Sequence, residues 1–428
     1  MADCLLTANC SLLVTDLLPM STPFQDRSTA ALGLPRVGIV CDLLQEHWAS
    51  MDLVGDMLLE NLRQGHRWSF VAERLRPAPT KRFLHLGQGA GDTVGMAERA
   101  FGRFVRYPLW LSQRRRKFDL FHVVDHSYAH LVHHLPPERT VVTCHDVDAF
   151  RCLLEPARTL RRRFWRGITR RIVSGLQKAA WVICDTGATA DELLAQGWAH
   201  PERMSVIHLG AASVFSPNAD ADADYEAELL LGPHTHSVKL LHVGSSISRK
   251  RIDVLLHVLA EAKKTFPDAV LLRVGGPLTA DQQALAQRLG VDASVVAFPF
   301  LEDRILAAVY RKSTLLLLPS DREGFGLPLL EAMACGLPMI ASNLPALKEV
   351  GGEAALYSTA GDVGDFCRST VSMIGAARSR SSVLEHRRKA GLAQAAQFTW
   401  SKCADEVAKV YEKVLSRART SPGPQSSL

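Results

Sequence analysis

The sequence predicts an α/β protein of two domains, each a doubly wound parallel sheet. Strand-length apolar runs alternate with helical apolar patterns along most of the chain, and 428 residues suffice for two cores. An acidic, turn-forming stretch separates the two sets of segments. The predicted parts are a poorly ordered extension (1–35), a first doubly wound domain (36–215), a linker loop (216–236), a second doubly wound domain (237–395), a closing helix (396–418) and a disordered tail (419–428).

The composition limits the classes of protein. Hydrophobic residues make up 47% and charged residues 22%, which are ordinary globular values, and the formal net charge of +6 suits an anionic ligand without specifying nucleic acid. The nine cysteines lack the spacing of a zinc site or a disulfide framework, which favours a reducing, cytoplasmic compartment. Apolar runs are too short to span a bilayer, so a lipid-linked acceptor is reached from the membrane surface.

The first domain is predicted from six segments. Strands are expected at Arg36–Cys41, Phe118–Val124 and Thr140–Asp146, a helix at Ser50–Leu62, a strand running into a helix at Ala179–Leu194, and a last short strand at Val206–Gly210. Polar residues follow the strands, where a parallel sheet presents its ligand-facing edge. Asp125–His130 is one such polar cluster and is an acceptor-side candidate.

The second domain alternates more regularly. Strands are predicted at 238–243, 269–274, 295–298, 315–318 and 339–342, and helices at 252–266, 281–289 and 304–312, with a further helix beginning near Leu327. Between the fourth strand and that last helix, Gly324 and Gly326 remove side chains beside a helix N-terminus. Free N–H groups and the positive end of the helix dipole favour an oxygen-rich or anionic ligand there.

Two glutamates flank this glycine-rich helix start. Glu323 opens the loop, and Glu331 lies about one turn into the helix, so the pair could accept hydrogen bonds from two sets of hydroxyls on one polyol. The run Glu323-Gly-Phe-Gly-Leu-Pro-Leu-Leu-Glu331 resembles the Glu-x7-Glu signature of family 4 retaining glycosyltransferases. An ordinary strand-loop-helix unit explains the apolar run and the proline but not the paired glutamates.

The resemblance implies a fold and a set of roles. The fold is GT-B, in which two Rossmann-like domains face a deep cleft. The closing helix, expected here at 396–418, crosses back from the second domain to the first. Glu331 would hold the ribose of a nucleoside-diphosphate sugar, while Glu323 would position the sugar hydroxyls together with backbone N–H groups. Those groups belong to Gly324, Phe325, Gly326 and Leu327.

A second motif lies between the first strand and helix of the second domain. Gly244 follows the strand, and Arg249 and Lys250 precede the helix, which resembles the Gly-x5-Lys motif that holds the donor diphosphate in the family. Fixed basic groups can neutralise a diphosphate, so no metal and no cofactor beyond the donor substrate are expected.

His145-Asp146 resembles a His-Asp pair that contacts the donor sugar from the first domain. The alternative is a histidine satisfied by the neighbouring aspartate, without a catalytic duty. The first strand-helix junction departs from the family, because a Gly-Gly loop there is replaced by Asp42–Ser50. That departure leaves the role of the junction open.

The most basic stretch, Arg158–Arg171, also carries aromatic residues at near-helical spacing. It could lie on an anionic membrane leaflet or pack its apolar face on the sheet. No nucleic-acid module accompanies these arginines, so nucleic acid is not an expected partner.

The resemblance implies transfer of a hexose, with a weak indication of mannose, from a nucleotide sugar to a glycan, polysaccharide or lipid-linked acceptor. No first-domain carboxylate stands out as a nucleophile, which favours a front-face reaction over the two-carboxylate route of glycosidases. One alternative is a catalytically silent nucleotide-sugar-binding protein of the same fold. Another is hydrolysis or phosphorolysis of the nucleotide sugar.

Overall fold

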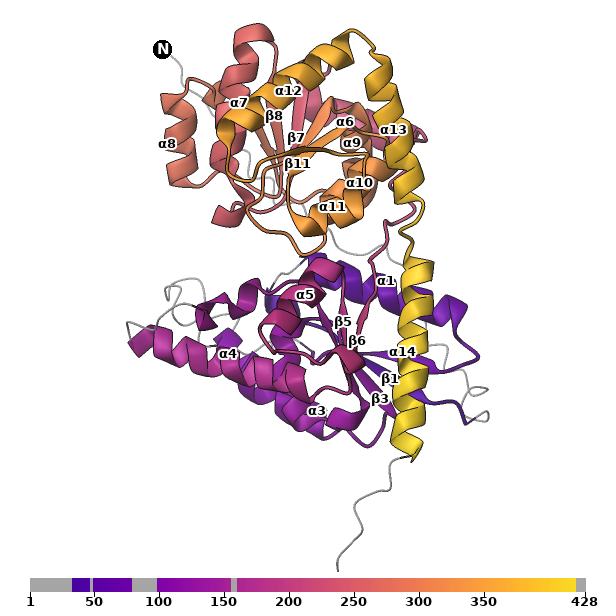
Figure 1. Ribbon diagram of the computed structural model, residues 1–428. Helices are drawn as coiled ribbons and strands as arrows, with labels where there is room; N and C mark the ends of the chain where they lie inside the picture. Colours follow the sequence, from indigo (N-terminus) through magenta and orange to yellow (C-terminus); the bar gives the residue numbers. More distant parts are fainter. Residues whose placement is uncertain (1–32, 47–48, 79–97, 155–159, 421–428) are drawn as a thin grey trace, which may run out of the picture. The chain divides into compact units, whose positions relative to one another are not determined.

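The computed structural model describes residues 33–46, 49–78, 98–154 and 160–420 (Figure 1). The predicted extension (1–35) and tail (419–428) fall almost wholly outside these residues. Within them, the chain forms two parallel sheets flanked by helices.

The first sheet has the strand order β2-β1-β3-β4-β5-β6, and all its strands are parallel. The strands are β1 (Arg36–Val40), β2 (Val71–Leu75), β3 (Leu120–Val123), β4 (Thr140–Cys144), β5 (Trp181–Cys184) and β6 (Met204–Val206). The helices around it are α1 (Ala49–Gly65), α3 (Tyr107–Ser112), α4 (Leu160–Lys178) and α5 (Gly187–Ala195), with 3-10 segments η4 (His126–His134) and η6 (Asp148–Leu153).

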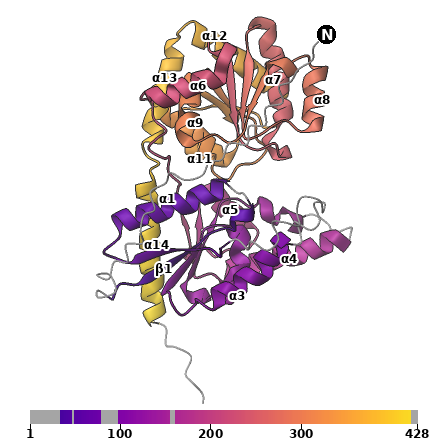
Figure 2. The ribbon, with the colours of Figure 1, turned by 180° about the vertical axis from the view of Figure 1, so that it is seen from behind.

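Side chains on these strands alternate between two apolar layers. Val37 and Ile39 of β1 pack in the layer that contains α1, and Val40 packs in the layer that contains α3 and α4. Figure 2 shows α1 separated from α3 and α4 in this way. The near-continuous apolar strands of the sequence are therefore buried on both faces.

The second sheet has the order β12-β11-β10-β7-β8-β9 and is also parallel. Its strands are β7 (Lys239–Val243), β8 (Val270–Val274), β9 (Val295–Phe298), β10 (Leu315–Leu318), β11 (Met339–Ser342) and β12 (Leu356–Ser358). The helices are α6 (Ala221–Leu231), α7 (Ile252–Thr265), α8 (Ala280–Arg288), α9 (Asp303–Lys312), α10 (Leu327–Ala334), α11 (Pro345–Gly351), α12 (Val363–Arg378), α13 (Ser382–Ala395) and α14 (Trp400–Thr420).

The predicted strands are present except the one at Val206–Gly210, which is wrong because β6 ends at Val206. The predicted linker loop at 216–236 is also wrong. Residues 221–231 form helix α6, capped by Asp220, whose carboxylate accepts a hydrogen bond from the Ala223 N–H at 3.2 Å. The helix buries Ala223, Ala227 and Leu231, an i, i+4, i+8 stripe hidden among alternating aspartates. Acidic residues suit the first turn of a helix because they face the positive end of its dipole.

The last helix, α14, packs on the first sheet. Its Tyr411 hydroxyl is hydrogen-bonded to His122 Nδ1 of β3 at 2.6 Å, and both side chains are fully buried. The chain therefore crosses between the sheets twice, at residues 207–220 and 396–399. The crossings are bonded to each other, because Ala211 N–H donates to the Phe398 carbonyl at 3.1 Å.

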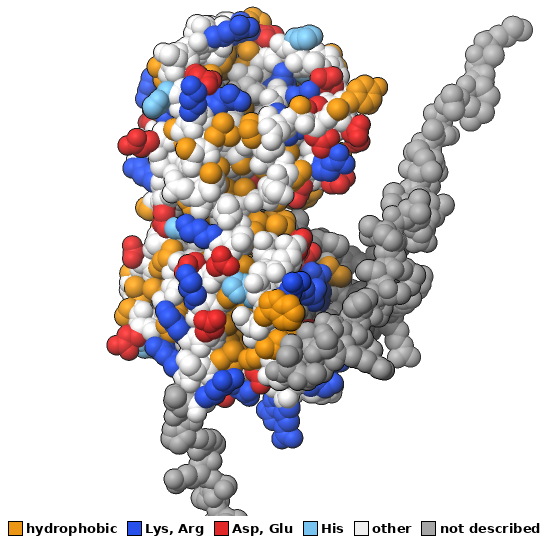
Figure 3. All heavy atoms as spheres, turned by 90° about the vertical axis from the view of Figure 1, so that its right-hand side faces the viewer, with side chains coloured by type: hydrophobic (Ala, Val, Ile, Leu, Met, Phe, Trp, Pro, Cys, Tyr) orange, Lys and Arg blue, Asp and Glu red, His pale blue; other side chains and the backbone are white. Residues whose placement is uncertain are grey.

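The surface in Figure 3 mixes both signs of charge. Lysine and arginine side chains are interspersed with aspartate and glutamate over the described part of this face, so it presents no broad basic stripe for a nucleic-acid backbone. Among the helices of the described ranges, none has the length and apolar character needed to cross a bilayer.

Candidate functional site

The candidate site lies where the strand order of the second sheet reverses. Strand β7 pairs with β10 on one side and β8 on the other, so the loops that follow β7 and β10 leave the sheet side by side. Ligands of open α/β sheets bind at such a switch point, at the carboxyl ends of the strands. The first loop carries Arg249 and Lys250, and the second carries Glu323.

These three predicted residues form a buried ionic cluster. Glu323 Oε1 accepts hydrogen bonds from Lys250 Nζ at 2.6 Å and Ser320 Oγ at 2.7 Å, and Glu323 Oε2 accepts from Arg249 Nη1 at 3.4 Å. Burial raises the pKa of Glu323, but Lys250 and Arg249 outweigh it and hold that pKa below its ordinary value. The Glu323 carboxylate is therefore ionised.

Backbone and ion-pair contacts fasten the two loops together. The Asp321 N–H donates to the Arg249 carbonyl at 2.8 Å, and Arg251 is paired with Asp321 at 2.9 Å. Arg251 has a φ of 50°, a left-handed conformation that costs free energy for a residue other than glycine. Its ion pairs with Asp321 and Asp253 hold it there.

Asp148 of η6 brings the first part of the chain into the site. It was not among the predicted site residues. Its carboxylate accepts a hydrogen bond from Arg322 Nε at 2.6 Å and lies 3.2 Å from Arg249 Nε. The only sequence signal was a second acid two residues after Asp146. A cavity of about 170 Å³ lies here. It is lined by Asp146, Val147, Asp148, Ala188, Thr189, Glu192, Arg249, Asp321, Arg322, Glu323, Leu344, Pro345 and Ala346.

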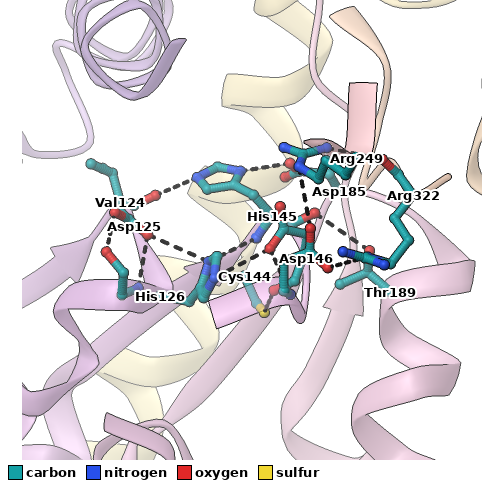
Figure 4. Close-up of polar contacts among 12 residues, drawn as sticks. Val124, Asp125, His126, Cys144, His145, Asp146, Asp185, Thr189, Arg249 and Arg322 are labelled. Atoms are coloured by element: carbon teal, nitrogen blue, oxygen red, sulfur yellow. Dashed lines mark hydrogen bonds and ion pairs between the residues drawn. The ribbon is translucent and has the colours of Figure 1, made fainter. Parts of the chain in front are cut away.

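His145 is placed beside this cavity but does not line it. Its Nδ1 is hydrogen-bonded to Asp185 at 2.6 Å and its Nε2 to the Val124 carbonyl at 2.7 Å (Figure 4). Burial lowers the pKa of His145, but Asp185, helped by Asp125 and the Val124 carbonyl, raises it to about 10. The partner is thus Asp185 rather than the neighbouring Asp146, and both ring nitrogens are donors. Sugar contact by His145 stays a prediction.

The glycine-rich loop is in direct contact with the first part of the chain. A Cβ at Gly324 would lie 1.8 Å from the His145 carbonyl oxygen, and the Thr186 hydroxyl donates to the Gly324 carbonyl at 2.9 Å. The sequence predicts room for a ligand beside Gly324, but the backbone of His145 fills that space. Gly326, with a φ of 91°, is the N-cap of α10, which begins at Leu327.

Phe325 and Glu331 are buried. Phe325 is 4% exposed and packs edge-on against Phe398. Glu331 Oε2 accepts a hydrogen bond from the Tyr310 hydroxyl at 2.7 Å, and burial raises the pKa of Glu331 to about 7 despite that bond. The structure thus brings Arg249, Lys250 and Glu323 together and places Glu331 one helical turn away along α10.

Asp42 and Asp125 form a second acidic group at the switch point of the first sheet, where β1 lies between β2 and β3. Asp42 is 3% exposed, and burial together with the charge of Asp125 raises the pKa of Asp42 to about 9. Neither this pair nor any other group in the described ranges assembles three His, Cys, Asp or Glu side chains around a metal position.

Comparison with known proteins identifies the family. The family model described as "Glycosyl transferases group 1" matches residues 232–361, and the model described as "Glycosyltransferase Family 4" matches residues 54–212. The chain belongs to glycosyltransferase family 4. The two matches fall on the second and first sheets respectively.

Two relatives are 32% and 26% identical to the chain over the aligned residues. D-inositol 3-phosphate glycosyltransferase of Mycobacterium sp. (strain JLS) is 32% identical over 223 residues, which are 49% of this chain and 49% of that protein. The chain thus matches about half the length of that relative. O-antigen chain mannosyltransferase B of Escherichia coli is 26% identical over 309 residues, 71% of this chain and 78% of that protein.

A solved structure shares the fold of the chain. HepE of Anabaena, crystallised with UDP and glucose, matches with a TM-score of 0.67 and 16% identity, covering 89% of this chain and 100% of that one. With two parallel six-stranded sheets, this likeness confirms the predicted two-domain GT-B fold.

Proposed function

We propose that the protein transfers a hexose from a nucleoside-diphosphate sugar to a glycan, polysaccharide or lipid-linked acceptor, with retention at the anomeric carbon. The observation that carries the proposal is the cluster of Arg249, Lys250 and Glu323 at the switch point of the second sheet. Basic groups there suit a diphosphate, and a carboxylate beside them suits sugar hydroxyls. Membership of family 4 supports the same reaction class.

In the proposed reaction, the bond between the anomeric carbon and the diphosphate oxygen breaks, and the acceptor oxygen bonds to the same face of that carbon. The acceptor proton passes to the departing phosphate oxygen. Arg249 and Lys250 stabilise the charge that develops on the diphosphate, so their effect is largest in the transition state. The nearby first-sheet carboxylates of Asp148 and Asp185 are bonded to Arg322 and His145 respectively. This arrangement favours the front-face route.

The donor proposed first is GDP-mannose. The mannosyltransferase relative supports mannose, while the HepE structure with UDP makes UDP-glucose the donor to compare. We propose further that the reaction needs no divalent metal, because the basic cluster supplies the positive charge. Turnover that survives EDTA supports this, and turnover restored only by added metal contradicts it.

The experiment is a binding and product assay with both donors. Wild-type protein is expected to show saturation-transfer NMR signals from one donor and to yield an acceptor product that carries the hexose. Lys250→Ala should lower turnover by about 100-fold, the scale of a lost group that stabilises transition-state charge. Lys264→Ala is the matched control, since Lys264 is also paired with a glutamate, Glu261, on the surface of α7.

Three outcomes separate the reaction classes. Hexose found on the acceptor supports transfer, while free hexose or hexose phosphate from the same donor indicates hydrolysis or phosphorolysis. Donor binding without any product supports the silent binding protein. A folded protein that binds no nucleotide sugar overturns the proposal as a whole.

A membrane contact of α4 belongs to the same proposal. Ile172, Val173 and Leu176 are buried against the first sheet, whereas Phe164 and Trp165, two to three turns earlier, are 65% and 46% exposed. Arg163 and Arg170 are exposed on the same helix. The second half of α4 thus packs on the sheet, and the exposed aromatic and basic side chains support the proposed membrane contact.

Vesicle co-sedimentation tests this contact. Anionic vesicles should retain the wild-type protein, and replacing Phe164 and Trp165 by serine should lower the bound fraction several-fold. Trp68→Ser is the matched control, since Trp68 is 69% exposed elsewhere on the surface. Equal binding of all three proteins contradicts the contact.

A further inference from the structure

Arg273 is a buried cation behind the loop that follows β7. It lies on β8, its side chain is fully buried, and its guanidinium donates hydrogen bonds to loop oxygens. Nη2 donates to the Gly244 carbonyl at 3.1 Å and to Ser246 Oγ at 2.9 Å, while Nη1 donates to the Gly276 carbonyl. One guanidinium thus ties the loop after β7 to the turn after β8.

The charge of Arg273 has no carboxylate partner. No aspartate or glutamate lies within ion-pair distance of it in the described ranges, and its Nε has no hydrogen-bond acceptor. By contrast, Arg249 and Lys250 are each paired with a carboxylate. A buried charge without a counter-ion is costly, so a fully buried arginine needs compensation from elsewhere.

His242 is a second buried group at the same place. It lies at the end of β7, is fully buried, and neither ring nitrogen has a hydrogen-bond partner. A Cβ built on Gly244 would lie 3.4 Å from the His242 ring and 3.6 Å from Lys250 Cε, so the ring sits directly beneath the loop. Burial, with the charges of Lys250 and Arg273, lowers the pKa of His242 well below its ordinary value. The ring is neutral and offers no counter-charge.

The loop after β7 and the turn after β8 are in close contact, so the Arg273 charge lies behind both. A Cβ at Gly275 would lie 2.3 Å from the Gly244 carbonyl oxygen. Ser246 Oγ also donates to the Pro277 carbonyl at 2.8 Å, and Gln282 of α8 donates to the Ser246 carbonyl at 3.2 Å. The backbone that would face a diphosphate is therefore held by Arg273 and its neighbours.

We propose that Arg273 is a positioning residue for the donor diphosphate: it orders the Gly244–Ser246 loop and supplies a buried positive charge that the diphosphate balances. The inference rests on the proposed function, since it assigns the ligand of the same site. The site then includes, beyond Arg249 and Lys250, Arg273 of strand β8, whose side chain does not itself touch the ligand.

The test compares nucleosides with and without the diphosphate group. Isothermal titration calorimetry measures binding of GDP, UDP and the uncharged nucleosides guanosine and uridine to wild-type protein, Arg273→Met and Arg273→Lys. The methionine variant keeps side-chain volume without charge and should weaken diphosphate binding by about 50-fold, while nucleoside binding changes less than about twofold. The lysine variant keeps the charge but not the branched donor set, and should weaken diphosphate binding by about fivefold.

Arg63→Met is the matched control, because Arg63 of α1 also donates to a backbone carbonyl, that of Ala72 in the first sheet. It should leave every affinity unchanged. Equal loss of nucleoside and diphosphate binding in Arg273→Met, or diphosphate binding at wild-type strength, overturns the inference. If Arg273→Met does not fold, Arg273→Lys decides the question by the same comparison, the loss of diphosphate binding relative to the loss of nucleoside binding. Failure of the proposed function appears instead in the wild-type protein, which would bind no nucleoside diphosphate.

Discussion

His145 has both ring nitrogens engaged, so its charge follows from its neighbours. Asp185 and the Val124 carbonyl each accept a hydrogen bond only when the imidazole carries both protons. The ring is therefore an imidazolium at neutral pH, with its pKa raised to about 10. Its carbonyl touches Gly324, so the residue fixes the loop that carries Asp146 and Asp148.

This raised pKa predicts a pH-dependent stability. The ordinary histidine pKa is about 6.5, so the contribution of His145 is complete below about pH 6.5 and is lost as the pH rises through about 10. Chemical unfolding should show that the unfolding free energy falls between pH 7 and pH 9.5 in both proteins. The fall should be about 1–3 kcal/mol smaller in His145→Gln than in wild type, because the variant lacks this titrating group.

His133→Gln is the control for this titration. His133 is bonded to the Arg171 carbonyl, and burial lowers its pKa, so it does not titrate between pH 7 and pH 9.5. Parallel pH profiles for wild type and His145→Gln would contradict the assigned charge.

At the scale of elements, the strand-loop-helix unit β10–α10 was predicted completely, and the role of one glycine was not. The apolar run, Pro319 and the glycines define the unit locally. The contact of Gly324 with His145 joins residues far apart in the sequence, so no local pattern contains it.

That contact predicts a large effect of one methyl group. Gly324→Ala places Cβ 1.8 Å from the His145 carbonyl oxygen, and the rigid backbone must move. The variant should fold, because the cores of both sheets are untouched, but turnover should fall by about 100-fold, as expected when catalytic groups are displaced by about 1 Å. Steady-state kinetics and circular dichroism measure the two properties.

Gly375→Ala is the matched control. Gly375 lies in α12, and a Cβ there meets nothing within 4 Å, so the variant should keep full activity. It should gain about 0.5–1 kcal/mol of stability, because alanine favours a helix interior. Full activity in Gly324→Ala would contradict the tight contact.

The same division between local and long-range information runs through the rest of the chain. The pairing of Arg249 and Lys250 with Glu323 was predictable, since both motifs follow strands at the switch point. Strand β2 was missed because it is a short edge strand with exposed charges, and α6 was missed because aspartates obscure its three small apolar positions. Asp148 was not predicted because its partners, Arg249 and Arg322, lie on loops of the second sheet.

For the whole molecule, the contacts between the two sheets' loops determine whether the site is assembled. Glu349 of α11 accepts hydrogen bonds from the Gly187 N–H at 2.9 Å, at the start of α5, and from His208 Nε2 at 2.8 Å. The cavity of about 170 Å³ is smaller than the roughly 300–1,000 Å³ of sites that enclose organic ligands. We expect donor binding to open such contacts, which re-form around the bound donor.

Glu349→Ala should favour the opened form. The loss of charge-assisted hydrogen bonds is expected to lower kcat/KM by about tenfold and to raise the radius of gyration measured by small-angle scattering. Glu353→Ala, an exposed glutamate two residues beyond α11, is the control and should change neither quantity. An unchanged scattering curve with unchanged kinetics would remove Glu349 from the closing contacts.

The paired crossings at residues 207–220 and 396–399 constrain this motion. A lone connecting segment can bend in any direction and can twist. Here the two segments are joined at Ala211 and Phe398, and Gly210 packs on the Trp400 backbone. Such a pair forms a ribbon that bends out of its plane but resists twisting. We expect opening to follow mainly one angle, with Asp148 and Glu349 separating from their partners together and returning in the same register after each turnover.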